Sequence, residues 1–202
     1  MTKIKLCGMM RPEDIQTAAA LRPDYIGFVF AKKSRRYVTP EQAEKLKALL
    51  PEEIAAVGVF ADEEPERVAQ LLDAGIIDLA QLHGHEDEAY LAALRKRTDR
   101  PLIRAFQIRE RKDLEEAEKS TADFLLLDAG AGSGETFDWA WLRDFPRPFF
   151  LAGGLSPDNV EGALERVHPY GVDVSSGIET DGRKDPDKMK LFVEKIKTSG
   201  RQ

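Results

Sequence analysis

Side chains that can move protons stand at the ends of three short apolar runs in this sequence. Cys7, the only cysteine among 202 residues, ends KIKLC, while His83 ends DLAQLH and Asp128 ends DFLLLD. Thiol, imidazole and carboxyl groups are the groups with which proteins carry out general acid–base chemistry. Cys7 and Asp128 also have simpler interpretations, since a lone strand cysteine is often a small buried apolar residue and an aspartate after a strand often shapes a turn. The strands and helices that carry Cys7 and Asp128 are therefore needed to choose between these interpretations.

The apolar runs that hold these residues belong to a pattern that spans the chain. Short runs rich in Val, Ile, Leu and Phe are typical of buried parallel strands. Eight such strands are predicted, at 3–7, 24–30, 55–60, 78–83, 101–107, 123–128, 148–152 and 171–176. Amphipathic segments that predict helices lie at 12–21, 40–50, 65–74, 86–97, 111–120, 138–143, 157–167 and 186–198.

Helix start and stop signals support this division. Thr39-Pro40 and Ser156-Pro157 each place a capping hydroxyl before a proline, which suits the first turn of a helix. Gly75 stands where the third helix should end. Strand and helix therefore alternate along the whole sequence.

Strict alternation of strand and helix predicts an α/β fold with a parallel sheet and right-handed crossovers. Eight units favour a closed (β/α)8 TIM barrel, formed by residues 1–202 as a single domain. The competing fold is an open, doubly wound sheet, which usually carries a glycine-rich nucleotide loop after its first strand. CGMMRP follows the first strand here and is not such a loop. The closed barrel is therefore the better prediction.

Strand parity predicts which side chains face the inside of the barrel, because alternate residues point to opposite faces. In KIKLC the cysteine and both lysines share one face, and the two aliphatic residues share the face that suits packing against helices. Asp128 shares its face with Leu126, and Gln81 shares its face with His83. An inward cysteine, histidine and aspartate are therefore expected to meet at the carboxyl-terminal mouth, where barrel enzymes carry their chemistry.

Composition and charge exclude several classes of partner. The net charge is −6, which argues against nucleic acid or an acidic membrane as a partner of the whole protein. A single cysteine excludes an internal disulfide and is typical of the cytoplasm. The first residues, MTKIKLCGMM, lack the apolar run of a signal peptide, and no stretch has the length of a membrane span. We therefore expect a cytoplasmic globular protein.

Anion-binding features follow three of the predicted strands. KKSRR, which contains Arg36, follows the second strand and would by itself be interpreted as a solvated loop. Gly153-Gly154 follows the seventh strand and Ser176-Gly177 the eighth, where barrels commonly bind phosphate through backbone amides. Each glycine pair alone is explained by a turn, but their joint position predicts a phosphate site. His83 and His85 have no third ligand at suitable spacing, so no metal site is predicted.

Six motifs of the sequence together resemble the phosphoribosylanthranilate isomerase family of tryptophan biosynthesis. They are KLCGMMRPED, GFVFAKKSRRYVTPE, QLHGHE, LLLDAGAGSGETFDW, LAGGLSPDNV and GVDVSSGIE, in the order in which the family carries them. The resemblance extends from Lys5 to about Lys197. One departure is visible, because the segment from Asp128 to Phe137 is shorter than in some relatives.

The resemblance implies an isomerase that carries out an Amadori rearrangement. N-(5-phosphoribosyl)anthranilate, an aminoaldose phosphate, would become 1-(2-carboxyphenylamino)-1-deoxyribulose 5-phosphate. Cys7 is implied as the general base and Asp128 as the general acid, without a metal or another cofactor. The implied partner is a small phosphosugar substrate, and family members occur as monomers and homodimers.

The resemblance also implies the residues that hold the substrate. Arg36 would bind the anthranilate carboxylate, for which its planar fork is suited. The other substrate-binding residues are Gln81, His83 and Asp173, and the phosphate-binding residues are Gly153, Gly154, Ser175, Ser176 and Gly177.

The implied roles place opposite demands on the two proton-transfer groups. A free thiol has a pKa of about 8.5, so the site should lower the pKa of Cys7 or form the thiolate only when it is needed. An exposed aspartic acid has a pKa of about 3.9, so an acid role for Asp128 requires burial or a negative neighbour. Two other functions stay open at this point: a different sugar-phosphate isomerase or epimerase on the same fold, and a phosphosugar-binding protein without catalysis.

Overall fold

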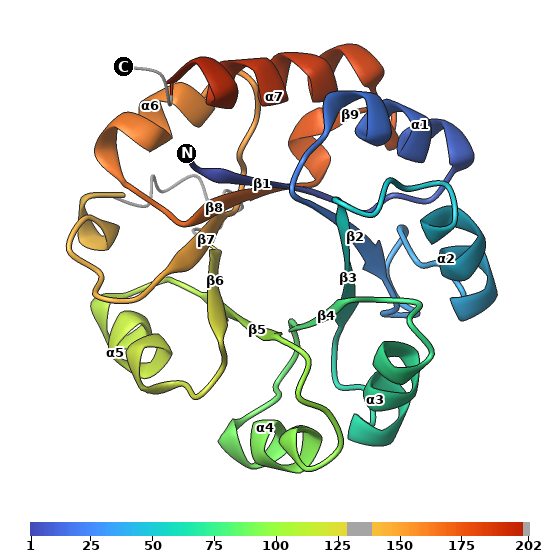
Figure 1. The fold of residues 1–202 in the computed structure, drawn as a ribbon. Helices are drawn as coiled ribbons and strands as arrows, with labels where there is room; N and C mark the ends of the chain where they lie inside the picture. The colour runs from blue at the N-terminus through green and yellow to red at the C-terminus, as the bar shows by residue number, and fades with distance from the viewer. Residues whose placement is uncertain (129–138, 200–202) are drawn as a thin grey trace.

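Eight parallel strands close into a barrel with helices around its outside (Figure 1). The structure is a computed structural model that describes residues 1–128 and 139–199. Neighbouring strands pair in sequence order from β1 to β8, and β8 pairs back to β1, with Leu6 opposite Val174. The predicted (β/α)8 barrel is confirmed, and its closure excludes the open doubly wound sheet.

The elements follow the predicted alternation closely. The barrel strands are β1 (Lys3–Cys7), β2 (Tyr25–Val29), β3 (Ala55–Phe60), β4 (Leu79–Leu82), β5 (Leu102–Gln107), β6 (Phe124–Asp128), β7 (Phe149–Ala152) and β8 (Gly171–Val174). The α-helices are α1 (Pro12–Leu21), α2 (Pro40–Lys47), α3 (Pro65–Asp73), α4 (Glu88–Arg95), α5 (Arg111–Lys119), α6 (Val160–Arg166) and α7 (Pro186–Ser199). Within residues 1–128 and 139–199, no helix is long and apolar enough to cross a membrane.

The start of α2 shows how local sequence sets an element boundary. The Thr39 hydroxyl accepts a hydrogen bond from the backbone N–H of Gln42, at 3.2 Å. The Gln42 side chain accepts one from the backbone N–H of Thr39, at 2.9 Å. Pro40 occupies the first helical position, where its missing N–H has no cost. The predicted cap is confirmed, and α3 ends at Asp73, two residues before Gly75, also as predicted.

Three segments differ from the prediction. The predicted helix 157–167 begins only at Val160, because Asn159 accepts a hydrogen bond from the Ser156 backbone N–H and holds the preceding residues in a turn. The predicted helix 138–143 is a short 3-10 helix, η1 (Trp139–Leu142), whose first predicted residue lies outside the described part of the chain. A second 3-10 helix and a small hairpin, which were not predicted, follow β8: η2 (Ser176–Ile178), β9 (Glu179–Thr180) and β10 (Arg183–Lys184).

The side chains inside the barrel follow the predicted parity. Ile4 and Leu6 of β1 belong to the large apolar core outside the strands, against the helices. Cys7 instead packs with Val29 and Val59 in a separate cluster. A second interior cluster consists of Val57, Leu79, Ile103, Leu126, Phe150 and Ala152, of which Ala152 borders the mouth. The inward direction predicted for Cys7 is confirmed.

Aromatic side chains fill the end of the barrel where the strands begin. Tyr25, Phe124 and Tyr170 contact the Phe150 ring at centroid distances of 5.5, 6.1 and 5.3 Å. The hydroxyl groups of Tyr25 and Tyr170 share a hydrogen bond of 3.0 Å, which satisfies both polar groups within the aromatic cluster. This packing blocks the amino-terminal end, so the open end of the barrel is the mouth where the strands finish.

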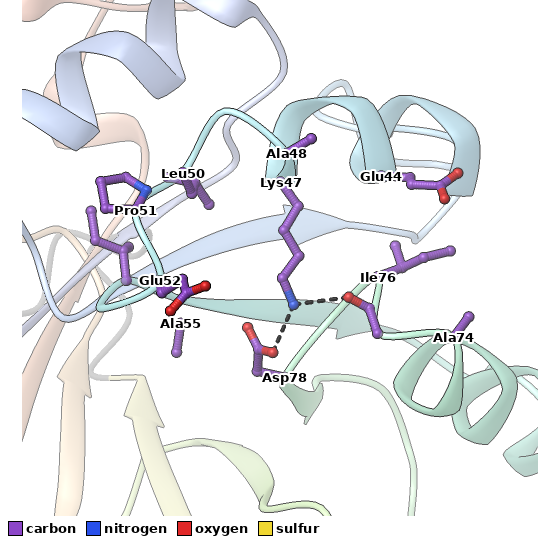
Figure 2. Close-up of a pocket in the computed structure, with 12 residues that line it drawn as sticks. Glu44, Lys47, Ala48, Leu50, Pro51, Glu52, Ala55, Ala74, Ile76 and Asp78 are labelled. Carbon is purple, nitrogen blue, oxygen red and sulfur yellow. Dashed lines mark hydrogen bonds and ion pairs between the residues drawn. The ribbon is translucent and has the colours of Figure 1, made fainter.

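A groove of about 470 Å³ lies on the outside of the barrel beside the starts of β3 and β4 (Figure 2). Lys47 crosses it and donates hydrogen bonds to Asp78, at 2.6 Å, and to the Gly75 carbonyl, at 2.9 Å. The second carboxylate oxygen of Asp78 accepts from the backbone N–H of Ala56, at 2.8 Å. Because its charged groups tie α2 to the start of two strands, this groove has a structural role.

Replacement of Asp78 by alanine is expected to lower the free energy of unfolding without changing chemistry at the mouth. The change leaves the buried Ala56 N–H without its acceptor and removes the ion pair of Lys47, which keeps only its bond to the Gly75 carbonyl; the loss should cost about 1–3 kcal/mol. Urea unfolding measures the loss. Glu44→Ala, an exposed change in the same groove, is the matched control and should stay within about 0.5 kcal/mol. Equal stability of the two variants would contradict the structural role.

Candidate active site

A cavity of about 640 Å³ opens at the carboxyl-terminal ends of the strands, a size typical of small-molecule sites. Ten of the eleven predicted site residues line it: Cys7, Arg36, Gln81, His83, Asp128, Gly153, Gly154, Asp173, Ser175 and Ser176. The remaining lining residues come from the same strand ends and loops: Val29, Ala31, Ser34, Val59, Phe60, Ala61, Gln107, Ala152, Leu155 and Val174. The structure thus brings together groups that lie up to 169 positions apart in the sequence.

Cys7 reaches the cavity because its neighbouring strand has no side chain at the matching position. Cys7 of β1 is in register with Gly27 of β2. A Cβ atom at position 27 would lie only 2.6 Å from the Cys7 sulfur. Any larger residue would therefore displace the thiol, so Gly27 is part of what positions it.

A buried ion pair lies one inward position below Cys7. Lys5 has no exposed surface, and its ammonium donates a hydrogen bond of 2.8 Å to Asp173 of β8. Burial lowers the pKa of Lys5, but the negative Asp173 and the nearby thiol outweigh burial, so the pKa is raised overall. Lys5 is therefore a permanent positive charge beneath the thiol.

The electrostatics of Cys7 correct one expectation from the sequence. Burial raises the pKa of the Cys7 thiol, and the negative charge of Asp173 adds to this effect. The positive charges of Lys5 and Lys184 oppose it without cancelling it. The expected lowering of the pKa is therefore wrong for the free protein, because the desolvation of a thiolate outweighs its attraction to Lys5. The alternative expectation, a thiolate formed only when it is needed, stays open.

Asp128 ends β6 and faces the cavity beside a short polar chain from β4. A carboxylate oxygen of Asp128 lies 3.9 Å from Nε2 of His83, and the amide of Gln81 is 3.0 Å from Nδ1 of the same ring. Gln81 is only 1% exposed, and its Oε1 has no hydrogen-bond partner in residues 1–128 and 139–199. A buried amide oxygen without a partner is costly, so this atom is a ready acceptor for a ligand hydroxyl group.

Arg36 lies in the loop after β2, with the aliphatic part of its side chain against Gly8 and its guanidinium against Glu179. Nε of Arg36 donates to one oxygen of Glu179 at 2.6 Å, and Nη2 donates to the other at 2.9 Å. Lys184 also donates to Glu179, at 2.7 Å. Burial raises the pKa of Glu179, but the bonds from Arg36 and Lys184 outweigh it and lower the pKa to about 2.

Sequence reasoning missed the roles of Glu179 and Lys184. Glu179 ends the quoted motif GVDVSSGIE, but nothing in its spacing indicated a partner. Both residues lie in strands of two residues each, which are too short to show a hydrophobic period. Only the pairing of β9 with β10 places their side chains beside Arg36.

The two glycine loops differ in what they offer to a ligand. Gly153 and Gly154 line the cavity after β7, and both have positive φ angles, of 93° and 63°. Gly177, the eleventh predicted site residue, does not line the cavity. A Cβ atom there would lie 1.9 Å from the Leu155 carbonyl oxygen, so Gly177 lets the loops after β7 and β8 pack together. Ser175 and Ser176 present the second loop to the cavity instead.

Other predicted residues lie away from the cavity or outside the description. His85 is exposed and pairs with Asp62. Lys32, Lys33 and Arg35 are exposed, which agrees with the interpretation of KKSRR as a solvated loop for these three residues. Residues 129–138, which hold the segment that is shorter than in some relatives, lie outside the described part of the chain.

The fold and cavity define the class of this protein. It is a (β/α)8 barrel with acid–base groups and anion-binding groups at the carboxyl-terminal ends of its strands, which is where barrel enzymes bind their substrates. Residues 4–195 match the family model described as N-(5'phosphoribosyl)anthranilate (PRA) isomerase.

Similar proteins agree with the family match. An N-(5'-phosphoribosyl)anthranilate isomerase of Streptococcus mutans serotype c is 48% identical over 200 residues, covering 98% of this chain and 100% of the relative. A crystal structure of monomers of the dimeric enzyme from Thermotoga maritima superposes with a TM-score of 0.86 at 36% identity. A structure of such an isomerase in complex with reduced 1-(o-carboxyphenylamino)-1-deoxyribulose 5-phosphate gives the same values. Each of the two superpositions covers 98% of this chain and 100% of the chain it is compared with.

This chain belongs to the N-(5'-phosphoribosyl)anthranilate isomerase family. The resemblance found in six sequence motifs is therefore confirmed.

The raised pKa of Cys7 gives a direct test of the site's electrostatics. The rate of alkylation by iodoacetamide should rise with pH through a midpoint above the value of about 8.5 for a free thiol. Mass spectrometry follows the reaction at this single cysteine, and the urea-unfolded chain supplies the reference midpoint. A midpoint in the folded protein at or below that of the unfolded chain would contradict the dominance of burial over Lys5.

Proposed function

We propose that this chain catalyses the reaction that names its family. N-(5-phosphoribosyl)anthranilate is converted to 1-(2-carboxyphenylamino)-1-deoxyribulose 5-phosphate, as a step of tryptophan biosynthesis in the cytoplasm. The protein acts on this small phosphosugar as a monomer or a homodimer. The observation that carries the proposal is the family match over residues 4–195, joined with a thiol and a carboxyl group in one cavity.

The substrate has two anionic ends with a sugar between them. One end is a phosphate and the other is the carboxylate of the anthranilate ring. Gly153, Gly154, Ser175 and Ser176 line the cavity on the side of β7 and β8, and their loops suit a phosphate. Arg36 lines it on the side of β2 and suits the carboxylate. The anions at the two ends would therefore hold the sugar across the mouth.

The first chemical step needs an acid. Asp128 in its protonated form gives a proton to the ring oxygen of the furanose, the bond from that oxygen to C1 breaks, and the nitrogen lone pair forms the C1 iminium. His83 lies 3.9 Å from the same carboxyl group and lines the cavity with it. In this proposal His83 binds the substrate beside Asp128, and the unpartnered Oε1 of Gln81 accepts from a sugar hydroxyl.

The second step needs a base. Cys7 as thiolate takes the proton from C2, and the C2–H electron pair moves toward the iminium to give an enolamine. The enolamine then takes up a proton at C1 and loses the proton of its C2 hydroxyl group, which gives the aminoketose. The iminium accepts the electron pair, so the sequence of steps requires neither a redox cofactor nor a metal ion to balance.

The two groups approach the sugar from different parts of the mouth. Cys7 is on β1 and Asp128 is on β6, with β7 and β8 between them. The buried charge of Lys5 stabilises the thiolate once it forms, and Asp173 holds Lys5 in place. In this arrangement Asp173 supports the site through Lys5, and the thiolate is formed at need.

Asp128→Asn and Cys7→Ala should each lower kcat by about 10²–10⁴-fold, the usual contribution of general acid or base catalysis. Turnover of freshly prepared N-(5-phosphoribosyl)anthranilate is followed by the loss of anthranilate-type fluorescence. Both variants should still bind the reduced product, which serves as the control for an intact cavity. Near-normal turnover in either variant would overturn its proposed role.

The unmodified protein tests the function itself. Rapid turnover of the same substrate supports the proposed reaction. Binding of the reduced product without any turnover would instead favour a phosphosugar-binding protein, and turnover of a different sugar phosphate alone would favour another isomerase.

Arg36→Met should raise KM for N-(5-phosphoribosyl)anthranilate and leave kcat nearly unchanged, because the lost contact binds a part of the substrate that does not react. Loss of a charge-assisted hydrogen bond of about 1.5–3 kcal/mol corresponds to a rise of roughly 10- to 150-fold. Steady-state kinetics measure both constants. An unchanged KM would argue against the carboxylate contact.

A further inference from the structure

Glu179 of the hairpin β9–β10 is the centre of a buried cluster of charges beside the cavity. Its side chain is only 4% exposed, and it accepts four hydrogen bonds from three cations. Arg35 donates through Nη2 at 2.8 Å, Lys184 through Nζ at 2.7 Å, and Arg36 through Nε and Nη2. Three positive charges thus surround one negative charge, and the positive excess favours a further anion nearby.

The contacts to Arg36 occupy only one edge of its guanidinium group. Glu179 takes the edge formed by Nε and Nη2 in a bidentate arrangement. Nη1 makes no hydrogen bond to the parts of the chain that are described, 1–128 and 139–199, while Arg36 lines the cavity. A guanidinium group has five N–H donors in a planar fork, so it can bind a second carboxylate on another edge at the same time.

Lys184 connects this cluster to the loop that follows β8. Its ammonium is almost fully buried and donates to the Ser175 carbonyl, at 2.9 Å, as well as to Glu179. The Ser175 hydroxyl in turn donates to the Cys7 carbonyl, at 3.2 Å. The position of Glu179 is therefore fixed relative to the end of β1 and to the serines that line the cavity.

We propose that Glu179 is a positioning residue that determines how the protein recognises the carboxylate of its substrate. It holds one edge of the Arg36 guanidinium, so that the remaining edge meets the carboxylate on the aromatic ring of the ligand. This inference rests on the proposed function and deepens it, since it names the residue that makes Arg36 selective for a carboxylated ring. Glu179 itself does not touch the reacting atoms.

Glu179→Gln tests the proposal, because glutamine has nearly the same shape but no charge and only one acceptor oxygen. KM for N-(5-phosphoribosyl)anthranilate should rise about tenfold, which corresponds to about 1.4 kcal/mol at 25 °C. kcat should change less than about twofold, since Cys7 and Asp128 are unaltered. A rise in KM with no loss of kcat is the signature of lost uniform binding.

A pair of ligands separates positioning from general damage to the cavity. The first ligand is the reduced product, which carries the ring carboxylate, and the second is the same compound without that carboxylate. Calorimetry should show that Glu179→Gln weakens binding of the first about tenfold, by the same conversion, and leaves binding of the second unchanged. Equal weakening of both ligands, or of neither, would overturn the proposal.

Variants of neighbouring residues complete the test. Arg35→Gln removes the exposed third donor of Glu179 but leaves both bonds to Arg36, so its KM should equal that of the unaltered protein. In an Arg36→Met background, Glu179→Gln should have no further effect on KM, because its effect passes through Arg36. Additive effects would show that Glu179 acts by another route and would overturn the proposal.

Folding and function are controlled separately. Thermal unfolding is measured for every variant. If Glu179→Gln fails to fold, Glu179→Asp replaces it in the test. Glu179→Asp keeps the charge and should show the same selective loss of binding, because its shorter side chain draws Arg36 out of place. If the unaltered protein neither turns over the substrate nor prefers the carboxylated ligand, the proposed function fails. If the unaltered protein turns over the substrate and prefers the carboxylated ligand, and the Glu179 variants do the same, only the inference about Glu179 fails.

Discussion

The ion pair between Lys5 and Asp173 joins the first strand of the barrel to the last one, and the geometry of the mouth depends on it. A lysine with no exposed surface must have a partner, because an uncompensated buried charge costs about 3–5 kcal/mol. The two residues are directly opposite each other in the pairing of β1 with β8, so the pair also fixes the register at which the barrel closes. Two residues further along the chain in each case, Cys7 and Ser175 reach the cavity, and the Ser175 hydroxyl donates a hydrogen bond to the Cys7 carbonyl.

The barrel separates stability from chemistry along its axis. Aromatic rings around Phe150 fill the end where the strands begin, and an aliphatic layer lies above them. Polar and charged groups are concentrated at the other end, where they are held by strand ends and loops. This arrangement has an electrostatic consequence for Cys7: the same burial that makes the barrel stable raises the pKa of the thiol, and Lys5 opposes the rise only in part. A raised pKa disfavours the thiolate in the free protein, and ionisation of the thiol is coupled to the binding of a ligand in the proposed mechanism.

Contacts between loops hold the polar groups of the cavity in place. The loop after β2 carries Arg36, and the hairpin after β8 carries Glu179 and Lys184, which hold Arg36 in one orientation. Gly177 lets the loop after β8 pack directly on the loop after β7. Three loops from different parts of the sequence therefore form one framework. Each loop would be mobile as an isolated segment, and together they give the guanidinium and the glycine backbone fixed positions.

Much of this protein could be predicted from its sequence. The alternation of apolar runs with amphipathic segments indicated eight strands and a closed barrel, the capping signal at Thr39 located the start of α2, and strand parity directed Cys7 inward. These features depend on residues close together in the chain, whose period and hydrogen bonding are local properties. Strand ends, glycine loops and the family motifs together predicted eleven site residues, and the fold brings ten of them to one cavity. The pairing of Glu179 with Arg36, the packing of Gly177 and the raised pKa of Cys7 could not be read in this way. The first two depend on partners more than 20 positions distant in the sequence, and the third depends on burial. Lys184, which also binds Glu179, lies in a hairpin too short to leave a sequence pattern. Only the closed barrel brings these groups into contact and excludes the water between them. The tertiary structure therefore determines their charge and orientation.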